Sequence, residues 1–208
     1  MRELNIENNM QLSKNFDSKY YKSGIYRNYK NLLAEWVSPV AKKIARFIKK
    51  PQAKILDVGC AHGYLIAELQ DEYNFIVRGI DYSSYAVRSA IPSVRGKIRQ
   101  GNILNLPFRN NIFDAVICLD VVNYLTTNEI KKAIANLIKV SKKYIFFCAI
   151  FRRSSWASQK INPDKFRISV LSKKEYVDIF NQKGAGLIKN FQAENGGQIL
   201  VFEKRPLF

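Results

Sequence analysis

From residue 54 onward, short apolar runs alternate with stretches of helical periodicity, and this alternation constrains the fold more than any other sequence feature. Apolar runs that indicate strands occupy residues 54–58, 75–80, 113–119 and 144–150, and a further short strand is expected at 97–100. Helical patterns fill residues 64–70, 84–90, 126–140 and 172–183. Such alternation is typical of a parallel sheet with helices on both faces. The strand-like runs 187–193 and 198–203 flank Asn195-Gly196-Gly197, a turn signal that predicts a C-terminal antiparallel hairpin. We therefore expect a doubly wound α/β fold with a mostly parallel, seven-stranded sheet.

Local signals set several helix ends. Thr126–Glu129 and Ser172–Glu175 are capping boxes, each predicted to open a helix. An N-terminal helix should run to about Lys50, with Ser38-Pro39 supplying an N-cap and first-turn proline for its second part. The 208 residues suit one domain, with 1–50 as an N-terminal lid or helical extension and 51–208 as the α/β core.

Composition excludes several classes of protein. The three cysteines, Cys60, Cys118 and Cys148, are far apart, and there is one histidine, so neither a disulfide framework nor a metal site is expected. No apolar run approaches the roughly 20 residues that a membrane helix needs. The first residues lack the apolar core of a signal peptide, so a cytoplasmic protein without a membrane partner is expected.

The net charge of +17 is unevenly distributed. Residues 1–50 and 131–208 are strongly basic, whereas residues 51–130 are almost neutral. Basic flanks favour an anionic partner. An equally good explanation is that lysine is simply the preferred surface residue of this chain.

A glycine turn joins the first predicted strand to its helix in Asp57-Val58-Gly59-Cys60-Ala61-His62-Gly63. Glycine lets a backbone approach a ligand, and the following helix offers free N–H groups. The spacing differs from the Gly-x-Gly-x-x-Gly of dinucleotide sites, and no Gly-Lys-Ser/Thr follows. Nicotinamide and Walker-type nucleotide binding are therefore disfavoured.

This run resembles motif I of the class I S-adenosylmethionine-dependent methyltransferases, with Ala61 where the family usually has a third glycine. The resemblance implies a Rossmann-like methyltransferase fold and S-adenosylmethionine as cofactor, with S-adenosylhomocysteine as product. It also implies cofactor contacts from the turn, namely from Asp57, Gly59, Cys60, Ala61, His62 and Gly63. His62 is the only histidine, and we expect it at the rim of the cofactor loop rather than in catalysis.

Later segments match the same family in order. Asp81 ends the second predicted strand, where the family places the acid that binds the cofactor ribose, and Tyr82 beside it could pack on the adenine. Asn102 and Ile103 stand where the family has residues around the adenine. Residues 106–118, which contain Leu-Pro-Phe and Phe-Asp, resemble a run common in small-molecule methyltransferases.

The fourth strand leads into Asp120-Val121-Val122-Asn123-Tyr124, which should face the ligand crevice. Relatives often carry a histidine near Asn123-Tyr124 that can act as general base. Without it, Asp120 becomes a candidate catalytic base, although a role in holding the cofactor amine or capping the next helix competes with it. Methyl transfer also gains from positioning alone.

Aromatic and basic residues supply candidates for the acceptor pocket. Tyrosines cluster at positions 20, 21, 26 and 29, and they serve either as a lid over a cationic sulfonium or as ordinary packing. The loop after the fifth strand contains an Arg pair suited to an anionic group, or simply to solvent. The candidate acceptor-binding residues are Tyr21, Tyr26, Tyr124, Arg152 and Trp156.

Three functions fit these features. The first is methyl transfer to an oxygen, nitrogen or carbon of a small-molecule acceptor, with an anionic acceptor matching the basic flanks. The second is an RNA methyltransferase whose basic flanks contact phosphates. The third is a module that binds S-adenosylmethionine without transferase activity. The sequence carries no signal for a particular oligomeric state, and fold resemblance does not select an acceptor.

Overall fold

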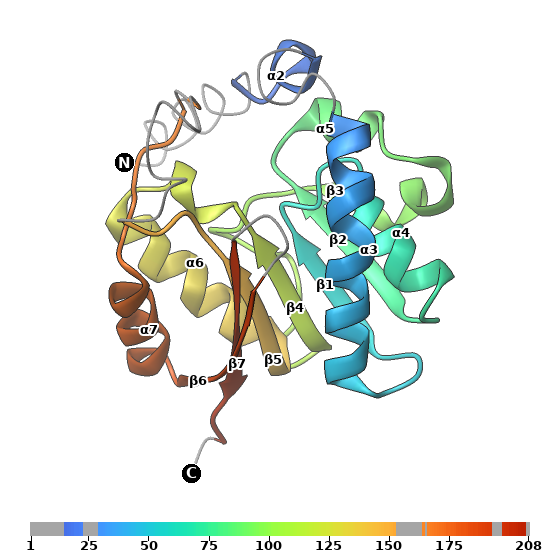
Figure 1. Cartoon of the computed structure of the whole chain (residues 1–208). Coiled ribbons are helices and arrows are strands. Elements are labelled where there is room, and N and C mark those ends of the chain that lie inside the picture. Colours follow the sequence, from blue (N-terminus) through green and yellow to red (C-terminus); the bar gives the residue numbers. More distant parts are fainter. Residues whose placement is uncertain (1–14, 23–28, 153–163, 165, 193–196, 207–208) are drawn as a thin grey trace.

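The computed structural model describes residues 15–22, 29–152, 164, 166–192 and 197–206 (Figure 1). Its centre is one seven-stranded sheet with the order β3-β2-β1-β4-β5-β7-β6. The strands are β1 (Lys54–Val58), β2 (Ile76–Asp81), β3 (Ile98–Gln100), β4 (Phe113–Leu119), β5 (Ser141–Cys148), β6 (Ala185–Gln192) and β7 (Gln198–Lys204). The first five are parallel, and β7 pairs antiparallel with both β5 and β6. The predicted α/β fold, with a mostly parallel sheet and a C-terminal hairpin, is confirmed.

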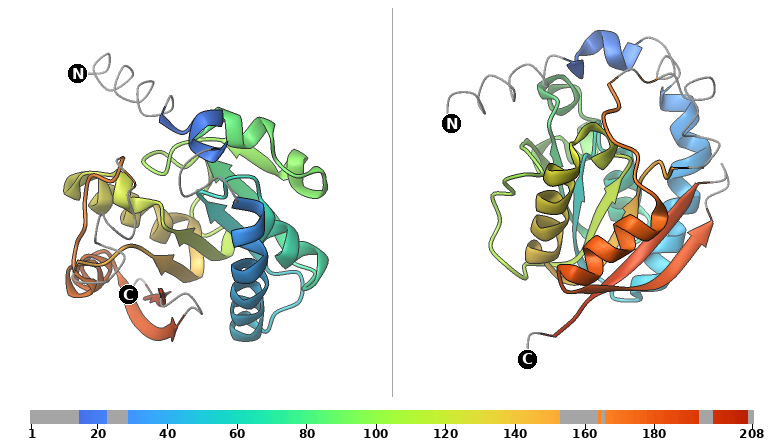
Figure 2. Two further views of the ribbon diagram at one scale, coloured as in Figure 1. Left: turned by 45° about the horizontal axis from the view of Figure 1, so that its top comes forward. Right: turned by 90° about the vertical axis from the view of Figure 1, so that its left-hand side faces the viewer.

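Helices cover both faces of the sheet (Figure 2). On one face, α3 (Tyr29–Ile48) and α4 (Tyr64–Asp71) enclose a core in which Ile44 and Ile66 pack with Ile55. On the other, α6 (Thr127–Val140) and α7 (Lys173–Gln182) enclose a second core. The short α5 (Ser84–Arg88) follows β2, and α2 (Ser18–Lys22) lies at the top of the molecule in Figure 1. None of the helices in the described part is long and apolar enough to cross a membrane.

Both predicted capping boxes are present. The Thr126 hydroxyl accepts from the backbone N–H of Glu129, whose carboxylate accepts from the N–H of Thr126 at 2.9 Å. Ser172 and Glu175 make the same reciprocal pair at the start of α7. Each box satisfies N–H groups that a helix start leaves without intrahelical partners.

The prediction that α3 restarts at Ser38-Pro39 is wrong. The helix runs without interruption through Pro39, and the Ser38 hydroxyl donates to Glu68 on α4 at 2.6 Å instead of capping. A proline inside a helix removes one backbone hydrogen bond. Burial of Val40, Ala41 and Ile44 against α4 and the sheet offsets that loss.

Some boundaries also differ from those expected. β5 begins at Ser141, directly after α6, and not near 144, because Ser141 pairs with Phe113 across a register shift. Two 3₁₀ turns, η2 (Pro92–Lys97) and η3 (Val122–Tyr124), were not predicted, because their sequences show no helical periodicity. Residues 195 and 196 of the predicted hairpin turn lie outside the described residues.

Candidate functional site

The carboxyl ends of β1, β2, β4 and β5 meet at one edge of the sheet because these strands are parallel. The segments that follow these four strands begin with Gly59, Tyr82, Asp120 and Ala149 in turn. Asp81 is the last residue of β2, so an acid and an aromatic side chain stand next to each other there. This edge therefore gathers acidic, aromatic and glycine residues from segments that are far apart in the sequence.

The turn after β1 depends on two glycines in left-handed backbone conformations. Gly59 has φ +84° and Gly63 has φ +85°. A Cβ atom on Gly59 would lie 2.1 Å from a methyl group of Val121, and one on Gly63 would lie 2.5 Å from Ile98. Ala61 also has a positive φ, of 47°, which explains why glycine suits this position.

Asp81 ties this turn to the end of β2. Its side chain is 7% exposed, and its two oxygens accept from the backbone N–H groups of Ala61 at 2.8 Å and Ser83 at 2.7 Å. Burial raises the pKa of Asp81, while these two hydrogen bonds lower it. A carboxylate has about four lone-pair sites, so Asp81 can still accept further hydrogen bonds from a ligand.

Asp57 is a buried carboxyl group without a partner among the described residues. It is 5% exposed and lies on β1, next to the turn. Burial, together with the nearby charge of Asp81, raises the pKa of Asp57 to about 8. A buried carboxyl with no hydrogen bond or counter-charge is costly, and a cationic ligand would relieve that cost.

Asp120 follows β4 with φ +57°, so its backbone is also left-handed. Its side chain is exposed to solvent at this edge and accepts a hydrogen bond from the Cys148 thiol, at 3.5 Å between sulfur and oxygen. Partial desolvation by the surrounding protein raises the pKa of Asp120, and the hydrogen bond from the thiol lowers it.

The remaining residues that were predicted to contact the cofactor differ in how deeply they are buried. Cys60 is buried, and its sulfur fills the space where a Cβ atom on Gly79 would stand. Ile103 belongs to the core on the α6 side. The side-chain oxygen of Asn102 accepts from the N–H of Leu104 at 2.8 Å, so one of its lone pairs is used within its own turn. The aromatic residue after β2, Tyr82, is half-buried.

His62 lies in the turn and contacts α2 and α5. Its Nδ1 shares a hydrogen bond with the Ser89 hydroxyl at 3.2 Å, and its ring lies 4.8 Å from the ring of Tyr21. Burial lowers the pKa of His62, so the neutral imidazole predominates at neutral pH. These contacts agree with placement at the rim of the turn.

The helix α2 lies across this edge and bridges its two sides (Figure 1). Asp17 caps it, accepting from two backbone N–H groups of its first turn. On the side of the glycine turn, the carbonyl of Phe16 accepts from the Ser83 hydroxyl. On the far side, the ring of Phe16 lies 5.0 Å from the ring of Tyr124.

A carboxylate that the sequence did not single out, Asp164, joins α2 to the segments after β4 and β5. One of its oxygens accepts from the hydroxyls of Tyr124 at 2.7 Å and Tyr20 at 3.2 Å. The two hydroxyls are 3.0 Å apart, and the other Asp164 oxygen accepts from the N–H of Phe166. We call Tyr20, Tyr124 and Asp164 the tyrosine–aspartate cluster.

Comparison with known families identifies the segment that carries this geometry. A family model described as a methyltransferase domain matches residues 55–144, which include the glycine turn, Asp57, Asp81 and Asp120. This matched segment, which we call the methyltransferase domain, makes up less than half of the chain. No group of histidine, cysteine and acidic residues that could hold a metal ion occurs in the described part of the chain.

Two curated proteins are similar to part of the chain. The chain is 32% identical over 124 residues to an uncharacterised protein of Methanocaldococcus jannaschii, a match covering 53% of the chain and 51% of that protein. It is 25% identical over 130 residues to norajmaline N-methyltransferase of Rauvolfia serpentina, covering 58% of the chain and 44% of the enzyme. The chain thus spans about half the length of the curated relatives it matches.

A solved structure shares the fold over nearly the whole chain. It is magnesium protoporphyrin IX methyltransferase from Synechocystis, crystallised with bound S-adenosylhomocysteine, with a TM-score of 0.74 and 16% identity. The superposition covers 94% of this chain and 99% of that enzyme. The methyltransferase domain is therefore of the class I fold, as the sequence motifs predicted.

Asn123 lies in the segment where the motif resemblance led us to expect a histidine, and its side chain is hydrogen-bonded within the chain. It is 2% exposed. Its side-chain amide donates to the carbonyls of Ile150 and Ser169, and its oxygen accepts from the N–H of Ile150. Asn123 therefore links the segment after β4 to those after β5, and these bonds occupy its amide.

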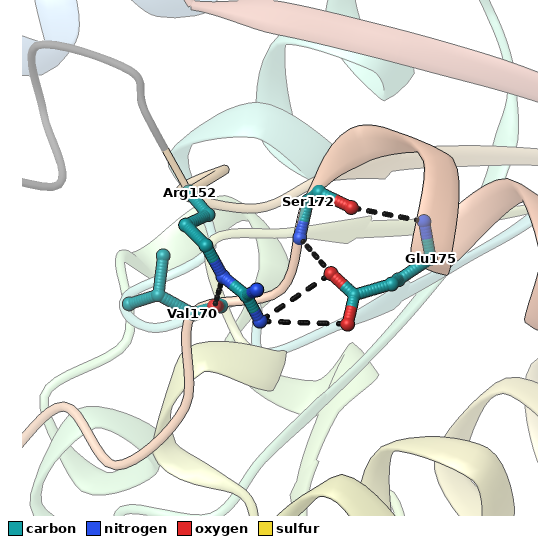
Figure 3. Close-up of polar contacts among 4 residues, drawn as sticks. All are labelled: Arg152, Val170, Ser172 and Glu175. Atoms are coloured by element: carbon teal, nitrogen blue, oxygen red, sulfur yellow. Dashed lines mark hydrogen bonds and ion pairs between the residues drawn. The ribbon is translucent and has the colours of Figure 1, made fainter.

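Arg152, predicted in the acceptor pocket of the methyltransferase domain, points toward the start of α7 (Figure 3). Its guanidinium donates to the carbonyl of Val170 at 3.2 Å and lies 3.4 Å from the Glu175 carboxylate, a member of the capping box. The structure does not bring Arg152 to the tyrosine–aspartate cluster. Tyr26 and Trp156 lie outside the described residues.

Proposed function

We propose that the chain is an S-adenosylmethionine-dependent methyltransferase that transfers a methyl group to an oxygen, nitrogen or carbon of a small-molecule acceptor. The observation that carries the proposal is the pair of buried carboxyls at the glycine turn, of which Asp57 has no partner among the described residues. S-adenosylmethionine carries a sulfonium and an ammonium group, and nearby carboxylates stabilise such charges. When bound, it supplies an activated methyl group.

The residues of the turn suit this cofactor in distinct ways. Asp81 can accept from both ribose hydroxyls in addition to its two backbone donors. Gly59 and Gly63 let the backbone approach the ligand where a side chain would collide with its neighbours. Asp57 would neutralise positive charge on the amino-acid portion, and Asp120 lies exposed toward the acceptor side.

The acceptor end consists of α2 and the tyrosine–aspartate cluster. Aromatic rings and hydroxyls there can hold an organic acceptor in line with the methyl group and exclude water, which is a major source of rate enhancement in transfer reactions. Acids such as Asp120 and Asp164 lie at this end together with cations such as Lys19, Lys22 and Arg167, so the described charges do not select the sign of the acceptor. The names of norajmaline N-methyltransferase and magnesium protoporphyrin IX methyltransferase, both with small-molecule acceptors, support the choice of a small molecule.

Calorimetric titration with S-adenosylmethionine and S-adenosylhomocysteine tests the proposal. We expect both to bind the unmodified protein and Asp81→Ala to weaken binding at least about tenfold, because the ribose loses a charged acceptor. Asp71→Ala, which removes an exposed acid at the end of α4, is the matched control and should bind normally. Absence of binding to the folded, unmodified protein would overturn the cofactor assignment. Binding without turnover across a broad panel of small acceptors would instead favour a non-catalytic binding module.

A further inference from the structure

A second site lies at the other end of the sheet, where β5 begins and β7 ends. It is a cleft of about 700 Å³. Its polar lining comes from the residues before β4, from the start of β5 and from the end of β7, and consists of Asn111, Lys142, Lys143, Glu203, Lys204 and Arg205. Because β1, β4 and β5 are parallel, this amino-terminal edge is opposite the edge that bears Asp57 and Asp120.

The lysines at and beside the start of β5 outnumber the carboxylates that contact them. Asp114 lies 2.7 Å from Lys50 and 3.7 Å from Lys142, so one carboxylate serves two ammonium groups. Lys143 lies 3.5 Å from Glu203. All three lysine side chains remain substantially exposed.

The cations at the end of β7 have only neutral partners among the described residues. The Lys204 ammonium donates to the side-chain oxygen of Asn111 and to the carbonyls of Ile138 and Ser141. Arg205 donates to a side-chain amide oxygen of α7 at 2.9 Å. Burial lowers the pKa of Lys204, as expected for a cation that lacks an acidic partner.

The charges around the cleft therefore do not balance within the described part of the chain. The cleft is lined by the cations Lys142, Lys143, Lys204 and Arg205 and by the acid Glu203. Lys50 and Asp114 adjoin it through the ion pair of Asp114 with Lys142. Five positive charges against two negative ones leave three that are uncompensated. An anionic partner would supply the missing counter-charges.

We propose that this cleft binds phosphate groups of a nucleic-acid strand. Lysine and arginine are the usual partners of phosphate oxygens, and release of counterions from a strand drives such binding. Two further lysines at the same edge, after the end of α3 and at the end of α6, would let the strand continue beyond the cleft. These are Lys49 and Lys139.

Binding in this cleft would not bring the nucleic-acid strand to the acceptor end. The cleft and the acceptor end lie at opposite edges of the sheet, so binding would localise the chain on nucleic acid rather than present a nucleotide for transfer. The inference therefore does not depend on the proposed function, and it is tested without cofactor.

The test is fluorescence anisotropy with a labelled single-stranded oligonucleotide of about 12 nucleotides, within the usual range of strand-site sizes. The probe is titrated with the full chain between roughly 50 and 200 mM salt. The variant Lys142→Gln/Lys143→Gln/Arg205→Gln removes three cations of the cleft but leaves Lys204 in place. The control, Lys131→Gln/Lys132→Gln/Arg99→Gln, removes three exposed cations from α6 and β3. A charge-preserving variant, Lys142→Arg/Lys143→Arg/Arg205→Lys, separates charge from folding.

We expect the cleft variant to bind at least about tenfold more weakly, and its salt slope to fall by about 0.7 for each phosphate that the cleft no longer neutralises. The control should weaken much less, and the charge-preserving variant should bind like the unmodified protein. Equal weakening in the cleft and control variants would overturn the proposal in favour of diffuse attraction by the net charge. Calorimetric binding of inorganic tripolyphosphate without any binding of the oligonucleotide would also overturn it, since the cleft would then take only small anions.

Discussion

The buried carboxyl of Asp57 leads, at the scale of a single residue, to a prediction about ligand affinity. This carboxyl is largely protonated below pH 8 in the ligand-free protein, and a bound cation favours the carboxylate. Affinity for S-adenosylmethionine should therefore rise with pH, by up to about tenfold per unit, and level off above about pH 8. Calorimetry at neutral pH in buffers of different ionisation enthalpy should detect a proton released on binding. Asp57→Asn should release none, and an unchanged proton count in that variant would exclude Asp57 as its source.

The same group should make stability depend on pH without any ligand. An acid whose pKa is higher in the folded than in the unfolded state favours the fold most at low pH, and this contribution is lost as pH rises from about 4 to about 8. Urea unfolding should show the free energy of unfolding falling between pH 5 and 8, with a slope of at most about 1.4 kcal/mol per unit. In Asp57→Asn, the free energy of unfolding should fall less steeply over this pH range. Asp114 should not contribute to this fall. Partial burial raises its pKa, but hydrogen bonds from Lys50 and Lys54 outweigh that effect and lower the pKa, so Asp114 titrates below pH 5.

Among single residues, the acidic side chains at the carboxyl edge were the most predictable from sequence. Asp57, Asp81 and Asp120 stand in or directly after apolar runs, so their positions follow from strand ends alone. Asp164 could not be found in this way, because it lies in a basic segment without periodicity and its tyrosine partners are distant in sequence. The direction of the Arg152 side chain was equally unpredictable, since a carbonyl and a carboxylate from a later segment determine it.

At the scale of helices and strands, the sequence predicted most elements because apolar period and cap chemistry agree locally. The capping boxes of α6 and α7 were predicted to the residue. The prediction failed at Pro39, where packing against α4 and the sheet outweighs the local break signal, and at η2 and η3, which have no periodicity. Tertiary contacts, which a local pattern does not contain, decide these cases.

The caps provide a test at this scale. Thr126→Ala and Ser172→Ala should each reduce the free energy of unfolding by about 1 kcal/mol, because a helix N–H loses its acceptor. Thr127→Ala, which makes the same chemical change one residue inside α6, is the control and should cost much less. Chemical denaturation measures all three, and equal decreases at Thr126 and Thr127 would contradict the role of the box.

The attachment of α2 depends on the tyrosine–aspartate cluster. Tyr124→Phe removes both the 3.0 Å hydrogen bond to the Tyr20 hydroxyl of α2 and the 2.7 Å bond that holds Asp164, and it should loosen α2, since a hydrogen bond contributes about 1 kcal/mol. Amide hydrogen exchange of Ser18–Lys22 should accelerate about tenfold or more. Exchange in α6 should not change. Unaltered exchange in α2 would show that its aromatic contacts alone hold it.

At the scale of the whole molecule, the sequence predicted the sheet and the uneven charge, but not where the charge gathers. Net charge can be counted along the chain, whereas the cleft arises because β5 and β7 bring Lys142, Lys143, Lys204 and Arg205 to one edge. Likewise, the turn signal predicted a hairpin but not the position of β7 between β5 and β6. Non-local pairing of this kind leaves no periodic trace in a sequence.

The interior position of β7 predicts which truncation the fold tolerates. Ending the chain after Gly197 removes Leu200, Val201 and Phe202, all fully buried, and leaves β6 without its partner. Such a chain should lose cooperative unfolding and expose apolar surface to a hydrophobic dye. Ending it after Arg205 leaves β7 intact and should preserve a cooperative transition. Cooperative melting of the shorter form would mean that the sheet can close between β5 and β6 directly.

The same strand order governs how the molecule is assembled during synthesis. β6 leaves the ribosome before β7, yet it can reach the sheet only through β7. Until then, β5 presents an open hydrogen-bonding edge on the side that β7 will occupy. Until β7 is synthesised, the nascent chain therefore has a nearly complete sheet whose β5 edge is unpaired. A chaperone or a second nascent chain can bind that edge only during this interval.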